Sequence, residues 1–303
     1  MFDMIDSDGR PLSAVYTRTR MRWEPVMEIT QIKGTSEVHP QLSPDDPFAG
    51  FEVRNKLLTG ADAKVSAGSY ARNALMQGLQ LVQSTGANPY KFDMVGSSDS
   101  HLGLAAIRED DCYGKLASDS LPASRVEMQG NFAASDVLAE DGTVGYQKGV
   151  PMGGDPSAAP AGKSPTFLVQ VSKDPQGANL DRVEIINGWL DASGKTHGKV
   201  YDVAWAGQRT PNAKGFVPAL PSTVNVERAS YENSVGTSQL NVMWRDPAFD
   251  PKQRAFYYVR ALEIEIPRHQ VYDAVALKLD PKVSGKPLTI QERAWSSPIW
   301  YTP

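Results

Sequence analysis

The chain has 303 residues, of which 41% are hydrophobic and 22% are charged, and its formal net charge is −4. These proportions are typical of a folded globular protein and exclude a disordered chain or a disulfide scaffold. No run of Lys or Arg would follow a phosphate backbone, so we expect no nucleic-acid partner. The acidic start, MFDMIDSDGRPLS, lacks the pattern of a signal peptide, and no stretch approaches the roughly 18 apolar residues of a membrane span. We therefore expect no membrane partner. The sequence does not determine the cellular compartment.

Strand and helix patterns alternate in the first part of the chain. Residues 26–32 alternate between two faces and end at Gly34, which predicts a short strand. Residues 66–86 begin with serines, carry apolar residues at helical spacing and end in Ser-Thr-Gly, which predicts an amphipathic helix. KFDMVG, residues 91–96, predicts a second strand. This strand, helix, strand order is typical of an α/β sheet or barrel.

The composition changes at residues 121–164, where Gly, Ala, Ser, Pro and Asp dominate and GVPMGGDPSAAPAGKSP resembles a linker. We predict an α/β segment over 1–130, a connection over 131–164 and a β-sandwich-like domain over 165–303. The last is indicated by short segments rich in β-branched and aromatic residues, typical of an antiparallel sandwich. These segments are TFLVQVS, DRVEIINGWLD, GKVYDVAWAG, SQLNVMWRD, RAFYYVRALEIEI and AWSSPIWYTP.

The clearest candidate for chemistry is the loop GSSDSHLG, which follows the strand at 91–96 and contains Asp99 and His101. Loops at the carboxyl ends of strands in α/β folds gather ligands and metals. An extended D-x-H directs a carboxylate and an imidazole to the same side, where a divalent cation accepts both. Glu28, Glu37 and His39 provide similar groups on two earlier segments, so five residues are candidate metal ligands.

A structural explanation exists for each candidate. Asp99 is also explained as a loop aspartate that stabilises a turn, and His101 is also explained as a surface histidine. We interpret His197 and His269 as structural or solvent-facing. Three acids stand before Cys112 and raise a thiol pKa, which argues against a nucleophile, and this lone cysteine forms no intramolecular disulfide. The motifs of α/β hydrolases, P-loop proteins and H-E-x-x-H metalloproteases do not occur.

Several long segments together resemble a large bacterial family of unknown function within or beside the PHP (polymerase and histidinol phosphatase) superfamily. They are EPVMEITQIKGTSEVHPQLSPDDPFAGFE, NPYKFDMVGSSDSHLG, GVPMGGD, KDPQGANLDRVEIINGW, DPAFDPKQRAFYYVRALEIEIPR and QERAWSSPIWYTP. The resemblance implies a partial (β/α) barrel with divalent metals at its C-terminal face and hydrolysis of phosphoesters. Asp99 and His101 match the last ligand motif of the superfamily. An H-x-H, an Asp-His and a further His that family members carry earlier are not found, and the chain resembles a member that starts after them.

The sequence thus predicts a metal-dependent hydrolase of small-molecule phosphoesters that uses zinc, manganese or iron. Asp99 and His101 would be catalytic, and a second chain in a homo-oligomer would complete the site, because half a barrel leaves open sheet edges. The alternative is a truncated, non-catalytic binding or structural member of the family. Carbohydrate binding by aromatic residues of the sandwich is a third hypothesis.

Overall fold

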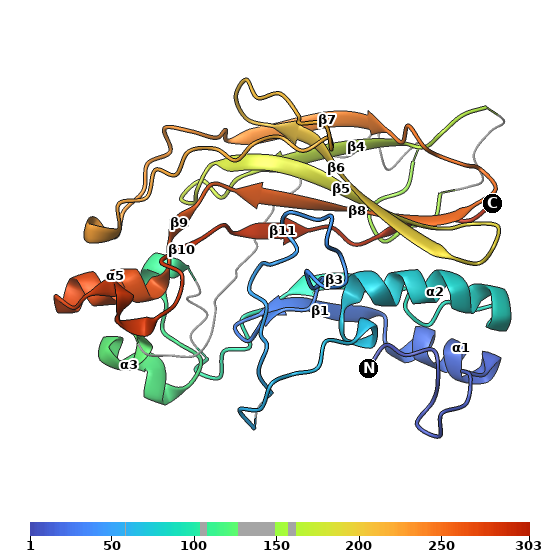
Figure 1. Cartoon of the computed structure of the whole chain (residues 1–303), viewed down its shortest axis with the longest axis horizontal. Helices are drawn as coiled ribbons and strands as arrows, with labels where there is room; N and C mark the ends of the chain where they lie inside the picture. Colours follow the sequence, from blue (N-terminus) through green and yellow to red (C-terminus); the bar gives the residue numbers. More distant parts are fainter. Residues whose placement is uncertain (58, 104–107, 127–148, 157–161) are drawn as a thin grey trace.

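The computed structural model describes residues 1–57, 59–103, 108–126, 149–156 and 162–303, in which helices and strands are mixed (Figure 1). The elements of the first half are α1 (Ala14–Trp23), β1 (Val26–Gln31), β2 (Gly34–Thr35), η1 (Ala67–Ser69), α2 (Ala71–Thr85), β3 (Asp93–Gly96), η2 (Glu109–Asp111), η3 (Ala117–Ser120) and α3 (Pro122–Val126). Those of the second half are β4 (Thr166–Ser172), β5 (Leu180–Leu190), β6 (Thr196–Trp205), η4 (Val226–Arg228), β7 (Gln239–Arg245), β8 (Arg254–Glu263), β9 (Ile266–Pro267), α5 (His269–Leu277), η5 (Pro281–Ser284), β10 (Thr289–Ile290), β11 (Arg293–Trp295) and β12 (Ile299–Tyr301).

The first part of the chain forms a small sheet with strand order β2-β1-β3. Strands β1 and β3 are parallel, with Glu28 beside Val95, and α2 lies between them in the sequence. The predicted strand, helix, strand unit is therefore confirmed. Helix α2 starts five residues later than the serine-rich segment suggested, because a short 3-10 turn, η1, comes first. It ends at Gly86, whose φ of 70° is a left-handed conformation that glycine adopts at little cost.

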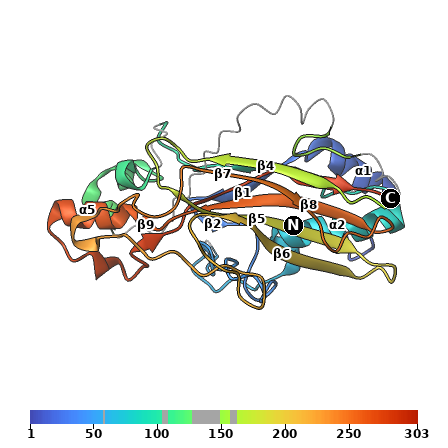
Figure 2. The same cartoon turned by 90° about the horizontal axis from the view of Figure 1, so that it is seen from above.

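The second part is built from antiparallel strands. The larger sheet has the order β11-β8-β5-β6, and β12 also pairs with β8, while β4 and β7 form a separate two-stranded ribbon. Seen from above, these strands run along the long axis of the molecule (Figure 2). The predicted combination of an α/β part and an antiparallel β part is confirmed. The described residues form no closed barrel, and among them no helix has both the length and the apolar character needed to cross a bilayer.

The larger sheet is the middle layer of the molecule. Side chains alternate across a strand, so neighbouring residues reach opposite faces. Ile185 and Tyr257 belong to the core shared with the β4–β7 ribbon, whereas Ile186 and Tyr258 belong to the core shared with α2 and β1. Strands β5 and β8 are consequently buried on both faces, which accounts for their nearly continuous burial (Figure 1).

The predicted division of the chain at residues 131–164 falls mainly outside the described residues and stays a prediction. Packing is continuous between the parts that flank it. Leu75 and Leu79 of α2 share one apolar cluster with Ile186 of β5 and Phe256 of β8. The two halves of the chain therefore contribute to a common core.

Helix α1 was not predicted from the sequence, and its composition explains why. The side chains that it buries are those of Thr17 and Arg20, so an apolar stripe at helical spacing is missing. Arg20 lies over the ring of Tyr90 at 5.0 Å and donates to Glu24 Oε2 at 2.9 Å. A cation on an aromatic face, rather than aliphatic packing, attaches α1 to the rest of the fold.

A buried network of charged groups joins the first part of the chain to the larger sheet. Its centre is Arg260 of β8, which is 0% exposed. The guanidinium donates from Nε to Glu184 Oε2 at 2.6 Å, from Nη1 to both oxygens of Glu37 at 3.1 Å, and from Nη2 to Asp46 Oδ1 at 2.8 Å. One arginine thereby contacts carboxylates from the loop after β2 and from the neighbouring strand β5.

A second arginine, Arg72 of α2, balances part of this negative charge. Its Nη2 lies 2.6 Å from Glu37 Oε1 and 2.8 Å from Asp46 Oδ2, and Tyr258 Oη also donates to Glu37 at 2.8 Å. Burial opposes ionisation of Glu37, but the Arg260 and Arg72 guanidinium groups outweigh it and lower the pKa of this carboxyl to about 2. Glu37 is therefore ionised and fully engaged in the interior.

We predict that Arg260→Ala lowers the free energy of unfolding by about 3–5 kcal/mol, because it leaves Glu37, Asp46 and Glu184 buried without their shared counter-ion. Chemical denaturation followed by circular dichroism measures the change. Arg245→Ala, at an exposed site on β7, is the control and should change the free energy by less than about 0.5 kcal/mol. Equal effects of the two substitutions would contradict a central role for Arg260.

Candidate functional site

The sequence-predicted loop lies at the carboxyl edge of the β1–β3 pair. Parallel strands end at the same side of a sheet, so the residues after β1 and after β3 are neighbours. The backbone N–H of Ser97 donates to the carbonyl of Thr30 at 3.0 Å and fixes the loop to β1. We call this region the carboxyl edge and define it by Glu28, Lys33, Asp99, His101 and Lys115.

Asp99 is the centre of the carboxyl edge. Its Oδ2 contacts Lys33 Nζ at 2.7 Å and also contacts Lys115 Nζ, while its Oδ1 lies 3.2 Å from His101 Nε2. The φ of Asp99 is 51°, a left-handed conformation that aspartate adopts more readily than most residues. The backbone N–H of His101 donates to the carbonyl of Lys115 at 2.8 Å and brings the second lysine to the loop.

Two lysines keep the Asp99 carboxyl ionised. Hydrogen bonds from Lys115 and Lys33, with a smaller one from His101, hold the pKa of Asp99 well below its usual range. The hydrogen bond to Asp99 in turn raises the pKa of Lys33. The carboxyl edge therefore presents a carboxylate and an imidazole side by side, flanked by two ammonium groups.

Glu28 lies on the same edge, on the exposed side of β1. Its Oε2 accepts a hydrogen bond from Gln31 Nε2 at 3.1 Å, and its charge contributes to the raised pKa of Lys33, which is paired with Asp99. Three of the five sequence-predicted candidates, Glu28, Asp99 and His101, are therefore at the carboxyl edge.

The other two candidates have structural partners elsewhere. Glu37 is held by Arg260, Arg72 and Tyr258 in the buried network. His39 is 6% exposed, accepts at Nδ1 from the backbone N–H of Gln41 at 3.1 Å and packs against the ring of Tyr70. We assign both side chains to the support of the loop after β2.

The donor atoms at the carboxyl edge are of a type that a divalent cation binds, but too few of them lie close together. A carboxylate oxygen and an imidazole nitrogen are suitable ligands for zinc, manganese or iron. Among the residues that the structure describes, however, no three His, Cys, Asp or Glu side chains lie close enough together to hold one metal ion. Asp99 and His101 thus form a two-donor site, next to which Lys33 and Lys115 already bring positive charge.

The sequence offered only a partial signal for the two lysines. Lys33 follows β1 by two residues, so its position after a strand places it at the same edge as Asp99. Lys115 is 16 residues from Asp99, and no local pattern in the sequence indicates a contact at that separation.

The other histidines and the cysteine considered in the sequence lie in positions that indicate structural roles. Burial raises the pKa of the Cys112 thiol to about 12, which agrees with the expectation that it is no nucleophile. His197 pairs with Asp191 at 2.7 Å and stacks on Trp189 in the β5–β6 hairpin. His269 is buried at the start of α5, where its backbone N–H donates to Glu109.

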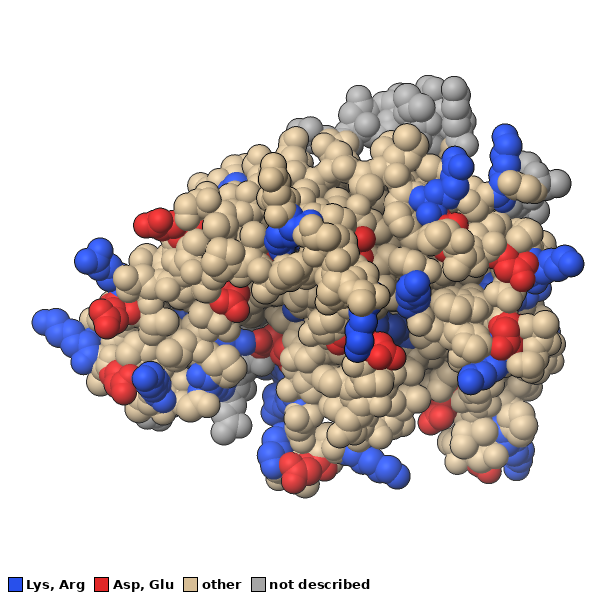
Figure 3. All heavy atoms as spheres, turned by 45° about the horizontal axis from the view of Figure 1, so that its top comes forward, with Lys and Arg blue, Asp and Glu red and all other residues tan. Residues whose placement is uncertain are grey.

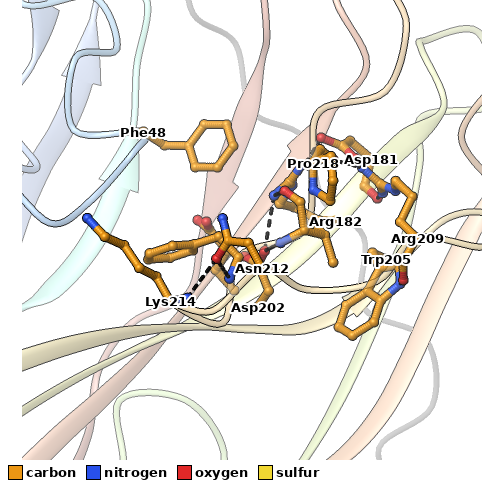
Figure 4. A network of polar contacts seen from close by, with 12 residues as sticks. Phe48, Asp181, Arg182, Asp202, Trp205, Arg209, Asn212, Lys214 and Pro218 are labelled. Atoms are coloured by element: carbon orange, nitrogen blue, oxygen red, sulfur yellow. Dashed lines mark hydrogen bonds and ion pairs between the residues drawn. The ribbon is translucent and has the colours of Figure 1, made fainter.

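A second polar network, shown in Figure 4, holds the loop after β6. Arg182 is 1% exposed and donates to Asp202 Oδ2 at 3.1 Å, to the carbonyl of Val217 at 2.8 Å and to that of Pro218 at 3.0 Å. Its guanidinium also lies 4.9 Å from the ring of Phe48. The guanidinium of Arg182 is used by the protein itself, so we assign the network to loop support, although Asp202 Oδ1 is buried without a hydrogen-bond partner among the described residues.

The aromatic side chains of the ribbon and the sheet pack against one another. Phe167 lies 4.6 Å from Tyr257, and Trp244 lies 5.0 Å from Tyr201, measured between ring centroids. This arrangement favours a role in the core over a carbohydrate cleft. On the face in Figure 3, basic and acidic side chains are interspersed over the surface.

Comparison with known proteins identifies a family. The model of the family described as "Protein of unknown function (DUF3604)" matches residues 1–143 and 128–303, so the chain belongs to this family. No curated protein and no solved structure matches the chain.

We predict that the Asp99 carboxyl titrates below the usual aspartate midpoint of about 3.9 and that Lys115→Ala moves the midpoint upward, because one of its two lysine partners is lost. A pH titration of the side-chain carboxyl ¹³C resonance measures both values. The linked loss of stability should occur as the pH falls, since a lowered pKa favours the folded state only while the group is ionised. An unchanged midpoint in Lys115→Ala would contradict the ion pairing.

Proposed function

We propose that this protein is a metal-dependent hydrolase of small-molecule phosphoesters that acts at the carboxyl edge. The observation that carries the proposal is the pairing of Asp99 and His101, 3.2 Å apart, at the carboxyl end of a parallel βαβ unit and beside two lysines. The resemblance of this segment to the PHP superfamily supports the proposal. In this interpretation β1, α2 and β3 are one unit of a partial (β/α) barrel.

The residues of the carboxyl edge have different parts in the proposal. Asp99 Oδ1 and His101 Nε2 are two metal ligands, whereas Glu28 lies on the same edge without converging on them. A divalent ion bound there would supply a water of lowered pKa as the nucleophile. Lys33 and Lys115 hold Asp99 ionised, and their ammonium groups are suited to bind the oxygens of a phosphoryl group.

The proposal includes a homo-oligomer. The described residues provide two converging donors at the carboxyl edge, whereas catalytic metal sites take three protein ligands for each metal and multinuclear sites take more. A second copy of the chain would supply the missing groups. Light scattering during size-exclusion chromatography, with and without added Mn²⁺ or Zn²⁺, tests this part.

A non-catalytic binding role is the second candidate, and one observation favours it. The charge of Asp99 is already balanced by Lys33 and Lys115 without a metal. In this case the carboxyl edge would be a stable ion cluster and the protein would neither bind a divalent ion there nor hydrolyse esters.

We predict that Asp99→Asn and His101→Ala each weaken Mn²⁺ or Zn²⁺ binding by at least about tenfold and abolish metal-dependent hydrolysis of p-nitrophenyl phosphate esters. Calorimetry on chelator-treated protein and a colorimetric assay provide the two readouts. Asp191→Asn and His197→Ala are matched controls, because they alter an Asp–His pair at 2.7 Å away from the carboxyl edge.

The lysines separate the two candidate functions. In the hydrolase, Lys115→Ala should strengthen metal binding, because a competing cation is removed, and should raise KM for the phosphoester. Absence of a saturable metal site in the wild-type protein, together with equal results for the edge and control variants, would establish the non-catalytic alternative.

A further inference from the structure

A cavity of about 150 Å³ lies between the end of β8, the start of β11 and the segment around η2. Its volume is comparable to that of cavities that hold a benzene-sized molecule. Its lining includes five acidic residues and two tyrosines, and the groups that carry the argument are Glu109, Asp174, Tyr231, Glu263, Tyr272 and Glu292. The cavity is separate from the carboxyl edge, so a ligand bound in it would be independent of the proposed function.

Three carboxyl groups in the cavity wall have no lysine or arginine partner among the described residues. Glu263 and Glu292 are neighbours, because the backbone N–H of Glu263 donates to the carbonyl of Glu292 at 3.0 Å. Within the described part of the chain, no hydrogen bond or ion pair engages either side-chain carboxyl. Glu109 is 3% exposed; its Oε2 accepts from the backbone of His269, whereas its Oε1 is buried without a partner among the described residues.

The basic groups nearest the cavity are already engaged. Arg108 pairs with Asp110 at 2.6 Å, and Lys173 Nζ donates to the carbonyls of Asp174, Pro175 and Gly177. Arg293 Nη1 donates to the carbonyl of Phe48 at 2.9 Å, and its guanidinium lies 3.8 Å from the centre of the Phe51 ring. The cavity therefore retains an excess of acidic groups.

The titration behaviour of the two glutamates agrees with this geometry. Burial raises the pKa of Glu263 to about 7. Burial, reinforced by the neighbouring Glu109 and Glu263, raises the pKa of Glu292 well above its usual range. Lys173 opposes the shift of Glu263 and Arg268 that of Glu292, but within the described part of the chain neither base forms an ion pair with these half-buried carboxyls. A cation placed beside such a group favours its ionised form and releases the proton.

We propose that this cavity binds a small organic cation, an ammonium or guanidinium compound, with Glu263 and Glu292 as its counter-ions. A metal ion is disfavoured because no three acidic or His side chains of the described chain converge on one point. A polyatomic cation spans the separation between carboxyl groups and donates an N–H to each of them. Tyr231 and Tyr272 line the same space and provide aromatic surface against which a cation packs favourably.

Calorimetry on the full chain tests the proposal with n-butylammonium and guanidinium as probes, which distinguishes the two classes of cation. Tetramethylammonium, which has no N–H, and Ca²⁺ are the controls. We expect saturable binding of at least one N–H cation, with protons released to the buffer near pH 7. Binding should weaken at least tenfold in Glu263→Gln and Glu292→Gln and be unchanged in Glu265→Gln, whose side chain is exposed nearby on the same chain segment.

Folding of the variants is followed independently by thermal unfolding. Because the pKa of Glu263 is raised to about 7, this group favours the folded state at low pH and loses that contribution as the pH rises through about 7. Glu263→Gln should therefore fold and should reduce the decline in stability toward neutral pH. The proposal is overturned if neither N–H cation binds the wild-type protein, if tetramethylammonium or Ca²⁺ binds equally well, or if the glutamine variants bind as the wild type does.

Discussion

The arrangement of the molecule depends on how the charge of Arg260, a fully buried side chain, is neutralised. A buried guanidinium needs counter-charges at hydrogen-bond distance, and this one obtains them from β5 and from Glu37 and Asp46 in the segment after β2. Arg72 of α2 is a second cation that shares these last two carboxylates. The separate pieces of chain must be in place together, or each retains an uncompensated charge. Apolar packing across both faces of β5 and β8 provides the bulk of the burial, while the ion network fixes which loop lies over which strand.

This constraint explains how the candidate site is positioned. The segment that provides Glu37 and Asp46 begins directly after the β1–β2 hairpin, and β1 in turn pairs with β3. Anchoring that segment to Arg260 holds β1 against the larger sheet, so the loop after β3 starts from a rigid support. The carboxyl edge is thus an exposed set of charged groups carried by a well-packed base, a common arrangement for binding sites in α/β folds.

The sequence predicted those features that depend on short-range patterns. Alternation identified β1, and richness in β-branched and aromatic residues identified the strands of the second part. Helical spacing and Gly86 identified α2, and the position of Asp99 after a strand placed it at a sheet edge. The role of Glu37 was not predictable, because SEVH offers the same chemistry as a metal ligand and its partners Arg72 and Arg260 are 35 and 223 residues away in the chain. The acidic cavity was also not predictable, because the residues that line it come from six separate stretches of the chain.

The left-handed backbone at Asp99 has a consequence for how the loop responds to its surroundings. Its conformation is stabilised by pairing with Lys33, Lys115 and His101 more than by apolar contacts, and these groups are partly accessible to solvent. Dissolved ions weaken such attraction, with a screening distance of about 8 Å at physiological ionic strength. Salt therefore weakens the contacts that hold this loop more than it weakens the buried contacts of the strands beneath it.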